Sequence, residues 1–255
     1  MLQSVPLSPR LVLRAGADRS ARRVRVLAGT SDWRRNVLET LGAGAVLIAG
    51  TRPWPTSIGW RWPGIDVRDI EQRLQASLPG IGIDAAAMPR QIDRARLSLL
   101  CHQARPERTI IVKLAAVDDG LEHEAMALSL LTDRPLPGIA TPKVVATGLL
   151  GDGIAFLATD ALGLDRQRPA LDESLHSFER DLGDRLALLP RPADAPDDSV
   201  PVHGDLAPWN LRRTGRGLAL FDWETAGWGA PGSDLAHYRQ SCAQLTKWSV
   251  RARQR

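Results

Sequence analysis

The chain has 255 residues, of which 44% are hydrophobic and 24% are charged, and its formal net charge is +4. These values are close to those of average globular proteins and exclude a mainly disordered chain, a collagen and a coiled coil. The length fits one large domain or two small ones, at roughly 150 residues per domain. The longest apolar stretch, around Val46–Ala49, is far shorter than the roughly 20 residues of a membrane-spanning helix, so no membrane partner is expected.

Two cysteines, Cys101 and Cys242, are too few for a disulfide framework, and we expect both to be reduced. No apolar segment typical of a signal peptide follows the first arginines, so we expect a cytoplasmic protein. The basic residues are mostly arginines scattered along the chain, with one small cluster at Arg22, Arg23 and Arg25. Nucleic-acid binding is therefore kept as an alternative, but nucleic acid is not the expected partner.

The first 90 residues have a weak pattern and form an unassigned accessory region in our prediction. Short apolar stretches predict strands at Leu11–Leu13, Val24–Ala28 and Ala45–Ala49. Capping residues and apolar periodicity predict helices over Asp32–Leu41 and Val67–Leu78.

A clearer pattern begins near residue 91. Alternating and β-branched residues predict a hairpin formed by Arg94–His102 and Thr109–Leu114. The apolar face of Leu121–Leu131 predicts a helix, and a second pair of strands is expected at Val144–Thr147 and Ile154–Thr159. We take 91–162 as one structural region and 163–255 as the next.

The last region contains a helix, a loop and a hairpin in our prediction. The helix is expected over Asp172–Leu189, and the proline-rich Pro190–Pro201 is expected to be a surface loop. A turn at Thr214–Gly217 leads to the strand Leu218–Phe221, and Asp234 begins the final helix.

Four polar residues around that hairpin form a pattern typical of a metal and phosphate site. His203 and Asp205 are followed by Asn210, and an apolar strand then ends at Asp222. The side chains of Asn210 and Asp222 supply the oxygen ligands that Mg²⁺ prefers. Asp205, on the same loop, is placed to accept a proton from an attacking hydroxyl. The alternative is a polar loop with capping aspartates, which the combined spacing makes the weaker interpretation.

Residues 202–211 and 218–224, with Gly227–Ala236 behind them, resemble the aminoglycoside phosphotransferase family, the small-molecule branch of the protein-kinase-like fold. The resemblance extends from about residue 92 to 238. It implies an α+β fold of two lobes, with a small antiparallel-sheet lobe over 91–162 and a shortened, mainly helical lobe over 163–255. It also implies transfer of the γ-phosphoryl group from ATP or GTP to a hydroxyl of a small molecule.

The resemblance also implies roles for single residues of the loop. Asp205 would be the catalytic base, and Asn210 and Asp222 would bind Mg²⁺. His203 would support the loop from behind. Asp234 would either anchor the loop through backbone amides or cap the last helix.

The nucleotide site implied by the resemblance lies mainly in the first lobe. Lys113 would contact the nucleotide phosphates and pair with a glutamate of the next helix. Glu122 and Glu124 are both available, and the Glu-Ala-x-x-Leu pattern favours Glu124. Backbone groups of Asp160 and Ala161 would bind the base.

Three features depart from the family, one of which is the unassigned region of the first 90 residues. No glycine-rich phosphate loop precedes Lys113, since Gly80-Ile81-Gly82 is a weak candidate, and the chain ends soon after Asp222. A non-catalytic member of the fold that binds a nucleotide or a partner is therefore the alternative function. The sequence does not distinguish an aminoglycoside, a sugar, choline or another alcohol as the acceptor.

Overall fold

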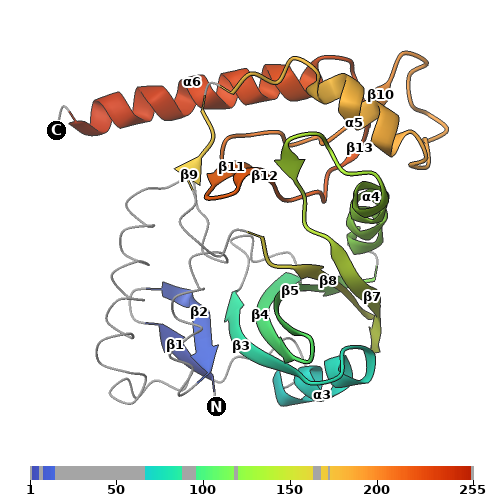
Figure 1. Ribbon diagram of the computed structural model, residues 1–255, viewed down its shortest axis with the longest axis vertical. Helices are drawn as coiled ribbons and strands as arrows, with labels where there is room; N and C mark the ends of the chain where they lie inside the picture. Colours follow the sequence, from blue (N-terminus) through green and yellow to red (C-terminus); the bar gives the residue numbers. More distant parts are fainter. Residues whose placement is uncertain are drawn as a thin grey trace. The chain divides into compact units, whose positions relative to one another are not determined.

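The structure, a computed structural model, describes residues 2–5, 8–14, 67–87, 96–117, 120–162, 168–171 and 173–253 (Figure 1). The chain divides into two compact units. Unit 1 comprises Met1–Glu122 and Val144–Leu164, and unit 2 comprises His123–Lys143 and Asp165–Arg255. The strands expected at Val24–Ala28 and Ala45–Ala49 and the helix expected over Asp32–Leu41 lie outside the described residues.

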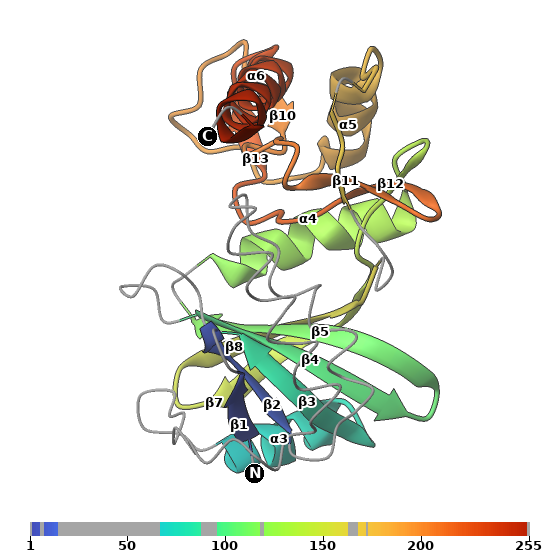
Figure 2. The ribbon, with the colours of Figure 1, turned by 90° about the vertical axis from the view of Figure 1, so that its left-hand side faces the viewer.

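A seven-stranded antiparallel sheet is the main element of unit 1, and Figure 2 shows its strands side by side. The strand order is β1-β2-β3-β4-β5-β8-β7. The strands are β1 (Leu2–Val5), β2 (Ser8–Arg14), β3 (Ile81–Ala87), β4 (Arg96–Ala104), β5 (Glu107–Ala116), β7 (Val144–Gly151) and β8 (Ile154–Asp160). The predicted hairpin, the predicted second strand pair and the strand at Leu11–Leu13 are confirmed. The first three strands come from the region that the sequence left unassigned.

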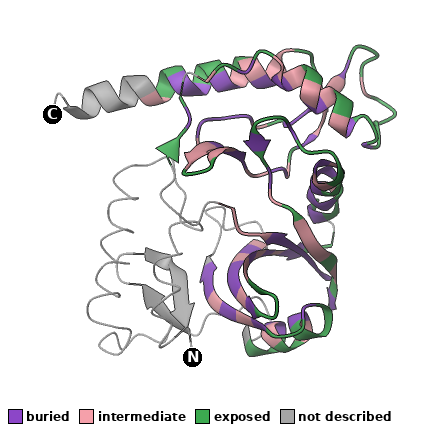
Figure 3. Cartoon of the chain, viewed as in Figure 1, coloured by how far each residue is buried: buried purple, intermediate pink, exposed green. Residues whose placement is uncertain are grey.

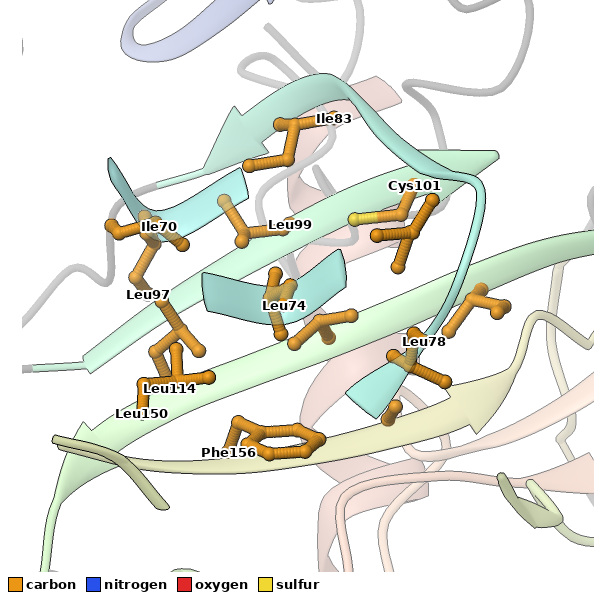
Figure 4. Close-up of a cluster of buried hydrophobic side chains, with 14 of the residues drawn as sticks. Ile70, Leu74, Leu78, Ile83, Leu97, Leu99, Cys101, Leu114, Leu150 and Phe156 are labelled. Atoms are coloured by element: carbon orange, nitrogen blue, oxygen red, sulfur yellow. The ribbon is translucent and has the colours of Figure 1, made fainter. Parts of the chain in front are cut away.

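One face of this sheet is covered by helix α3 (Val67–Ser77), which confirms the helix predicted there. Ile70 and Leu74 of α3 pack with Leu97, Leu99 and Phe156 of the sheet in one buried cluster (Figure 4). Burying such side chains away from water is the main contribution to the stability of the unit.

The burial pattern of β5 sets the face on which its lysine lies. Ile110, Val112 and Leu114 belong to the buried cluster, and the residues between them are half-buried, as the striped strands of Figure 3 show. Because successive side chains of a strand alternate between its two faces, Lys113 lies on the face opposite α3. Its neighbours across the ladder are Ser98 of β4 and Leu157 of β8.

Unit 2 combines helices with two small sheets. Its helices are α4 (Leu121–Asp133, in unit 2 from His123 on), α5 (Phe178–Leu186) and α6 (Ser233–Arg253). One sheet has the order β6-β12-β11-β9, and the other pairs β10 with β13. The strands are β6 (Ile139–Ala140), β9 (Arg168–Pro169), β10 (Val200–Val202), β11 (Leu211–Thr214), β12 (Gly217–Leu220) and β13 (Gly227–Gly229). The two units together confirm the α+β class.

Helix α5 is shorter than the helix predicted over Asp172–Leu189. Glu173 has two partners outside the helix: its carboxylate binds Arg213, and its backbone N–H donates to the hydroxyl of Tyr238 at 3.2 Å. These contacts hold the preceding segment in place, and the helix begins only at Phe178. Tertiary contacts here override the helical pattern of the sequence.

The structure also bears on the membrane and cysteine predictions. None of the helices in the described ranges is long and apolar enough to cross a membrane. Cys101 and Cys242 are both buried, and neither forms a disulfide in the part of the chain that the structure describes.

Candidate functional site

The hairpin β11–β12 places the two expected metal ligands next to each other. Leu211 pairs with Leu220, and the backbone N–H of Phe221 donates to the carbonyl of Asn210 at 3.0 Å. Asn210 therefore lies directly opposite Phe221, and Asp222 follows one residue later. The chain turns around at Gly215 and Arg216, as the sequence predicted.

Asp222 has an unusual backbone conformation, with φ at 63°. A residue with a Cβ rarely adopts this left-handed region, which costs about 1–3 kcal/mol and occurs most often at functional sites. The residue lies outside the ladder, since β12 ends at Leu220, and the chain then turns at Glu224 and Thr225. This conformation is an observation independent of the motif, and it favours the predicted functional role of Asp222.

A positively charged side chain, that of Arg212, interacts electrostatically with the carboxylate of Asp222. Arg212 of β11 donates from Nε to the carbonyl of Trp209 at 2.6 Å, and its guanidinium lies 5.8 Å from the centre of the Phe221 ring. Burial lowers the pKa of the Arg212 guanidinium, and the negative charge of Asp222 acts in the opposite direction. The site thus contains a permanent positive charge that sequence reasoning did not identify.

The side chain of His203 lies inside the protein and is hydrogen-bonded to the backbone on both sides of its ring. The residue is completely buried, and its ring lies edge-to-face against Trp223 with the ring centroids 4.6 Å apart. Its Nδ1 accepts the backbone N–H of Asp205 at 3.2 Å, so the ring proton must be on Nε2. Nε2 in turn donates to the carbonyl of Phe221 at 3.0 Å. One imidazole thus connects the loop of Asp205 to the strand end at Asp222.

Asp234 anchors the same loop from the start of α6. Its carboxylate accepts the backbone N–H of His203 at 2.6 Å and that of Gly204 at 3.0 Å. Asp234 is buried, and burial raises the pKa of its carboxyl group while the two backbone hydrogen bonds lower it. Of the two roles that the sequence left open for Asp234, the structure places it in the role of loop anchor.

Gly204 is required at its position for two reasons. Its φ is 82°, in the left-handed region that glycine adopts without strain. A Cβ at this position would also overlap the carbonyl oxygen of Thr225. The hydroxyl of Thr225 donates to the carbonyl of His203 at 3.1 Å, so this close approach is part of the packing of the loop.

Asp205 is held on both carboxylate oxygens. Nδ2 of Asn210 donates to Oδ2 at 2.8 Å and to the backbone carbonyl of Asp205 at 2.9 Å. Nε2 of His237, on α6, lies 3.0 Å from Oδ1. Both neighbours of the Asn210 amide nitrogen are acceptors, which fixes the orientation of the amide and leaves its Oδ1 as the group for a cation.

This arrangement fits Mg²⁺ with few protein ligands. Within the described ranges, no three His, Cys, Asp or Glu side chains come together to hold a metal by themselves. Mg²⁺ in phosphoryl-transfer sites is typically bound by one or two protein oxygens, and phosphate and water oxygens supply the rest. The amide oxygen of Asn210 and the carboxylate of Asp222 match this donor set.

The expected lysine–glutamate pair stays a prediction, since Lys113 belongs to unit 1 and Glu124 to unit 2. Glu124 is only 2% exposed, whereas Glu122 is exposed, which favours Glu124 as the paired residue. A buried carboxylate is costly unless it has a partner. Lys113 itself is half-buried in the middle of β5.

The segment expected to bind the base follows β8. The backbone N–H of Ala161 donates to the carbonyl of Thr109 at 3.1 Å, and the carboxylate of Asp160 lies 3.7 Å from Arg108. The N–H of Ala161 is therefore engaged within the sheet and is not available to a base in this state. The weak candidate Gly80-Ile81-Gly82 forms the turn before β3 and its first residues, where Gly82 pairs with His102.

Two histidines of unit 2 were not identified from the sequence. His237 contacts Asp205, and the signal for it is its position three residues after Asp234, on the same face of α6. His123 of α4 makes a short hydrogen bond to the carbonyl of Ala226, just beyond the candidate metal ligand Asp222. No local pattern around His123 indicates this contact.

Comparisons with known proteins agree with the motif. Residues 155–248, which include Asp205, Asn210 and Asp222, match the model of the phosphotransferase enzyme family. The resemblance inferred from the sequence is therefore confirmed over this part of the chain. A comparison with curated protein sequences found no match.

The chain also has similarity to solved structures. The chain is similar to a thermostable mutant of aminoglycoside phosphotransferase APH(4)-Ia in a ternary complex with ADP and hygromycin B, with 10% identity, 72% of this chain and 82% of that chain covered, and a TM-score of 0.46. It is also similar to the amicoumacin kinase hAmiN in complex with AMP-PNP and Ca²⁺, with 13% identity, 68% and 70% coverage, and a TM-score of 0.44.

Proposed function

We propose that this chain is a small-molecule kinase that transfers the γ-phosphoryl group of ATP or GTP to a hydroxyl of a small acceptor. The observation that carries this proposal is the geometry around Asp205. Its carboxylate is held on both oxygens, and the backbone of Asn210 is hydrogen-bonded to Phe221, the residue before Asp222. The match of 155–248 to the phosphotransferase enzyme family supports the same reaction class.

In the proposed reaction, Asp205 is the general base. Its carboxylate accepts the proton of the acceptor hydroxyl while the hydroxyl oxygen forms a bond to the γ-phosphorus. The bond from that phosphorus to the bridging oxygen breaks, and the nucleoside diphosphate leaves. Bound Mg²⁺ would neutralise the charge of the phosphate oxygens. Asn210 and Asp222 would hold it, and His203 and Asp234 keep the loop in place.

Lys113 and Glu124 complete the proposed nucleotide site. In this proposal the Lys113 ammonium contacts the phosphates, and the buried Glu124 carboxylate holds it. Backbone groups of Asp160 and Ala161 bind the base, for which the N–H of Ala161 must first leave the carbonyl of Thr109.

The test is an ATP-consumption screen over sugars, amino alcohols and aminoglycosides, with and without Mg²⁺. We expect ADP release that depends on one acceptor class and is lost in Asp205→Ala. Thermal stabilisation by Mg²⁺–ATP without turnover on any acceptor would favour the alternative of a non-catalytic nucleotide-binding protein. Salt-sensitive binding of DNA with no effect of ATP would contradict both.

A further inference from the structure

His237 makes a contact that the proposed reaction does not yet explain. It lies in the first turns of α6, and its Nε2 is 3.0 Å from Oδ1 of Asp205. On the other side of the same carboxylate, Asn210 binds Oδ2 at 2.8 Å. The two donors come from different parts of unit 2 and meet on one side chain.

Hydrogen bonds rather than packing determine the direction of this carboxylate. The Asp205 side chain is 37% exposed and that of His237 is 42% exposed, so neither is enclosed by neighbours. The imidazole in turn rests against Trp209, with the ring planes at 88° and the centroids 6.5 Å apart. An ionised carboxylate only accepts hydrogen bonds, so the ring proton facing Asp205 must be on Nε2.

Attachment of α6 to the loop does not depend on this contact. Asp234, one turn earlier on the same helix, already binds the backbone N–H groups of His203 and Gly204 with both of its oxygens. Removing the His237 ring leaves those two bonds in place. The side chain is also partly exposed, so its loss opens no buried cavity.

We propose that His237 is a positioning residue that acts through Asp205: its Nε2–H holds Oδ1 so that the base faces the acceptor hydroxyl in one fixed direction. This inference rests on the proposed function. A carboxylate oxygen has two acceptor positions, so Oδ1 can bind His237 and the incoming hydroxyl together. Without the hydrogen bond from His237, the Asp205 carboxylate can adopt several orientations. A catalytic group that is misplaced by about 1 Å can lower the rate a hundredfold.

The test compares His237→Leu with His237→Gln. The side-chain amide of glutamine places an N–H donor at about the position of the histidine Nε2, whereas leucine has no donor. His176→Leu, at an exposed histidine of the same unit, is the control. Crystal structures give the direction of the Asp205 carboxylate. Steady-state kinetics with Mg²⁺–ATP and the acceptor that is active in the ATP-consumption screen give kcat and KM.

We expect His237→Leu to lower kcat by about 10–100-fold with the KM for ATP within about twofold of wild type. His237→Gln should recover most of kcat, and His176→Leu should match wild type. In the crystals, Asp205 should be reoriented in His237→Leu and keep its wild-type direction in His237→Gln.

Two outcomes would overturn the inference. The first is that His237→Leu changes neither the direction of the Asp205 carboxylate nor kcat. The second is that both His237 variants lose kcat equally and that this loss accompanies a fall in their melting temperature. Failure of the proposed function looks different: the wild type then turns over no ATP with any acceptor, yet Asp205 is still reoriented in crystals of His237→Leu.

Discussion

The carbonyl oxygen of Asn210 accepts the backbone N–H of Phe221 at 3.0 Å, one pair beyond the end of the β11–β12 ladder. This bond makes the two candidate magnesium ligands neighbours through the backbone, since Asp222 directly follows Phe221. Their separation is thus set by hairpin register rather than by side-chain packing.

Removing the carboxylate of Asp205 should abolish phosphoryl transfer and leave nucleotide binding intact. The expected loss is more than tenfold in kcat, or more than about 1.4 kcal/mol of transition-state stabilisation, because base catalysis contributes about 10²–10⁴-fold. Steady-state kinetics and nucleotide titration of Asp205→Ala measure the two effects separately. Asp198→Ala, an exposed carboxylate on the preceding loop, is the control. A variant that keeps more than about a tenth of the rate would show that Asp205 is not the base.

Removing the carboxylate of Asp222 should eliminate the effect of Mg²⁺ on nucleotide binding. Asp222→Gly is the informative variant, since glycine adopts a φ of 63° without strain while alanine does not. We expect ATP titrations of this variant to give the same affinity with and without Mg²⁺. Asp222→Ala should show the same loss together with lower stability. A Mg²⁺ effect as large as in wild type would exclude Asp222 as a ligand.

A methyl group at Gly204 should destabilise the loop more than one at Gly232. Both glycines have a φ of 82°, so an alanine at either position has the same backbone strain of about 1–2 kcal/mol. Only at Gly204 would the new Cβ overlap backbone, namely the carbonyl of Thr225; at Gly232 it meets nothing within 4 Å. Urea unfolding of Gly204→Ala and Gly232→Ala isolates the clash. Equal losses would mean that the loop moves aside freely.

The raised pKa of Asp234 predicts a pH dependence with a definite sign. Burial, its main cause, lifts the pKa of this carboxyl above its ordinary 3.8 in the folded protein. Between the two values the folded state holds a proton that the unfolded state has released. The stability contributed by this group is therefore complete below about pH 4 and is lost as the pH rises through the folded-state pKa.

Asp234→Asn has no such ionisation and is the reference for that measurement. The difference in unfolding free energy, wild type minus variant, should shrink as the pH rises from about 4 towards neutral, because other groups titrate alike in both proteins. A series of urea unfolding curves across this range measures it. A difference that grows with pH would mean that the backbone N–H groups of His203 and Gly204 outweigh burial.

Local signals accounted for much of the fold and for the loop motif. β-Branched alternation predicted the hairpin β4–β5, and turn residues predicted the reversal between β11 and β12, because both depend on neighbours in sequence. The motif also pointed to His203, Asp205 and Asn210, which lie close together in the sequence and are hydrogen-bonded to one another through Asp205.

Contacts between distant residues were not predictable in the same way. The pairing of Leu11 in β2 with Ala87 in β3 joins segments far apart in sequence, and no periodicity encodes it. The two-residue strands β6 and β9 exist only because β11 and β12 provide a ladder for them. His237 became part of the site because the anchor at Asp234 fixes where α6 begins.

The two-residue turn between β11 and β12 also determines where this chain tolerates inserted residues. Gly215 and Arg216 are exposed, and extra residues inserted between them would extend a solvent loop without changing the ladder. A single residue inserted within β12 would turn the following side chains to the opposite face and separate Asp222 from Asn210. A fluorescent label or epitope tag is thus compatible with the proposed chemistry at the reversal and incompatible with it a few residues away.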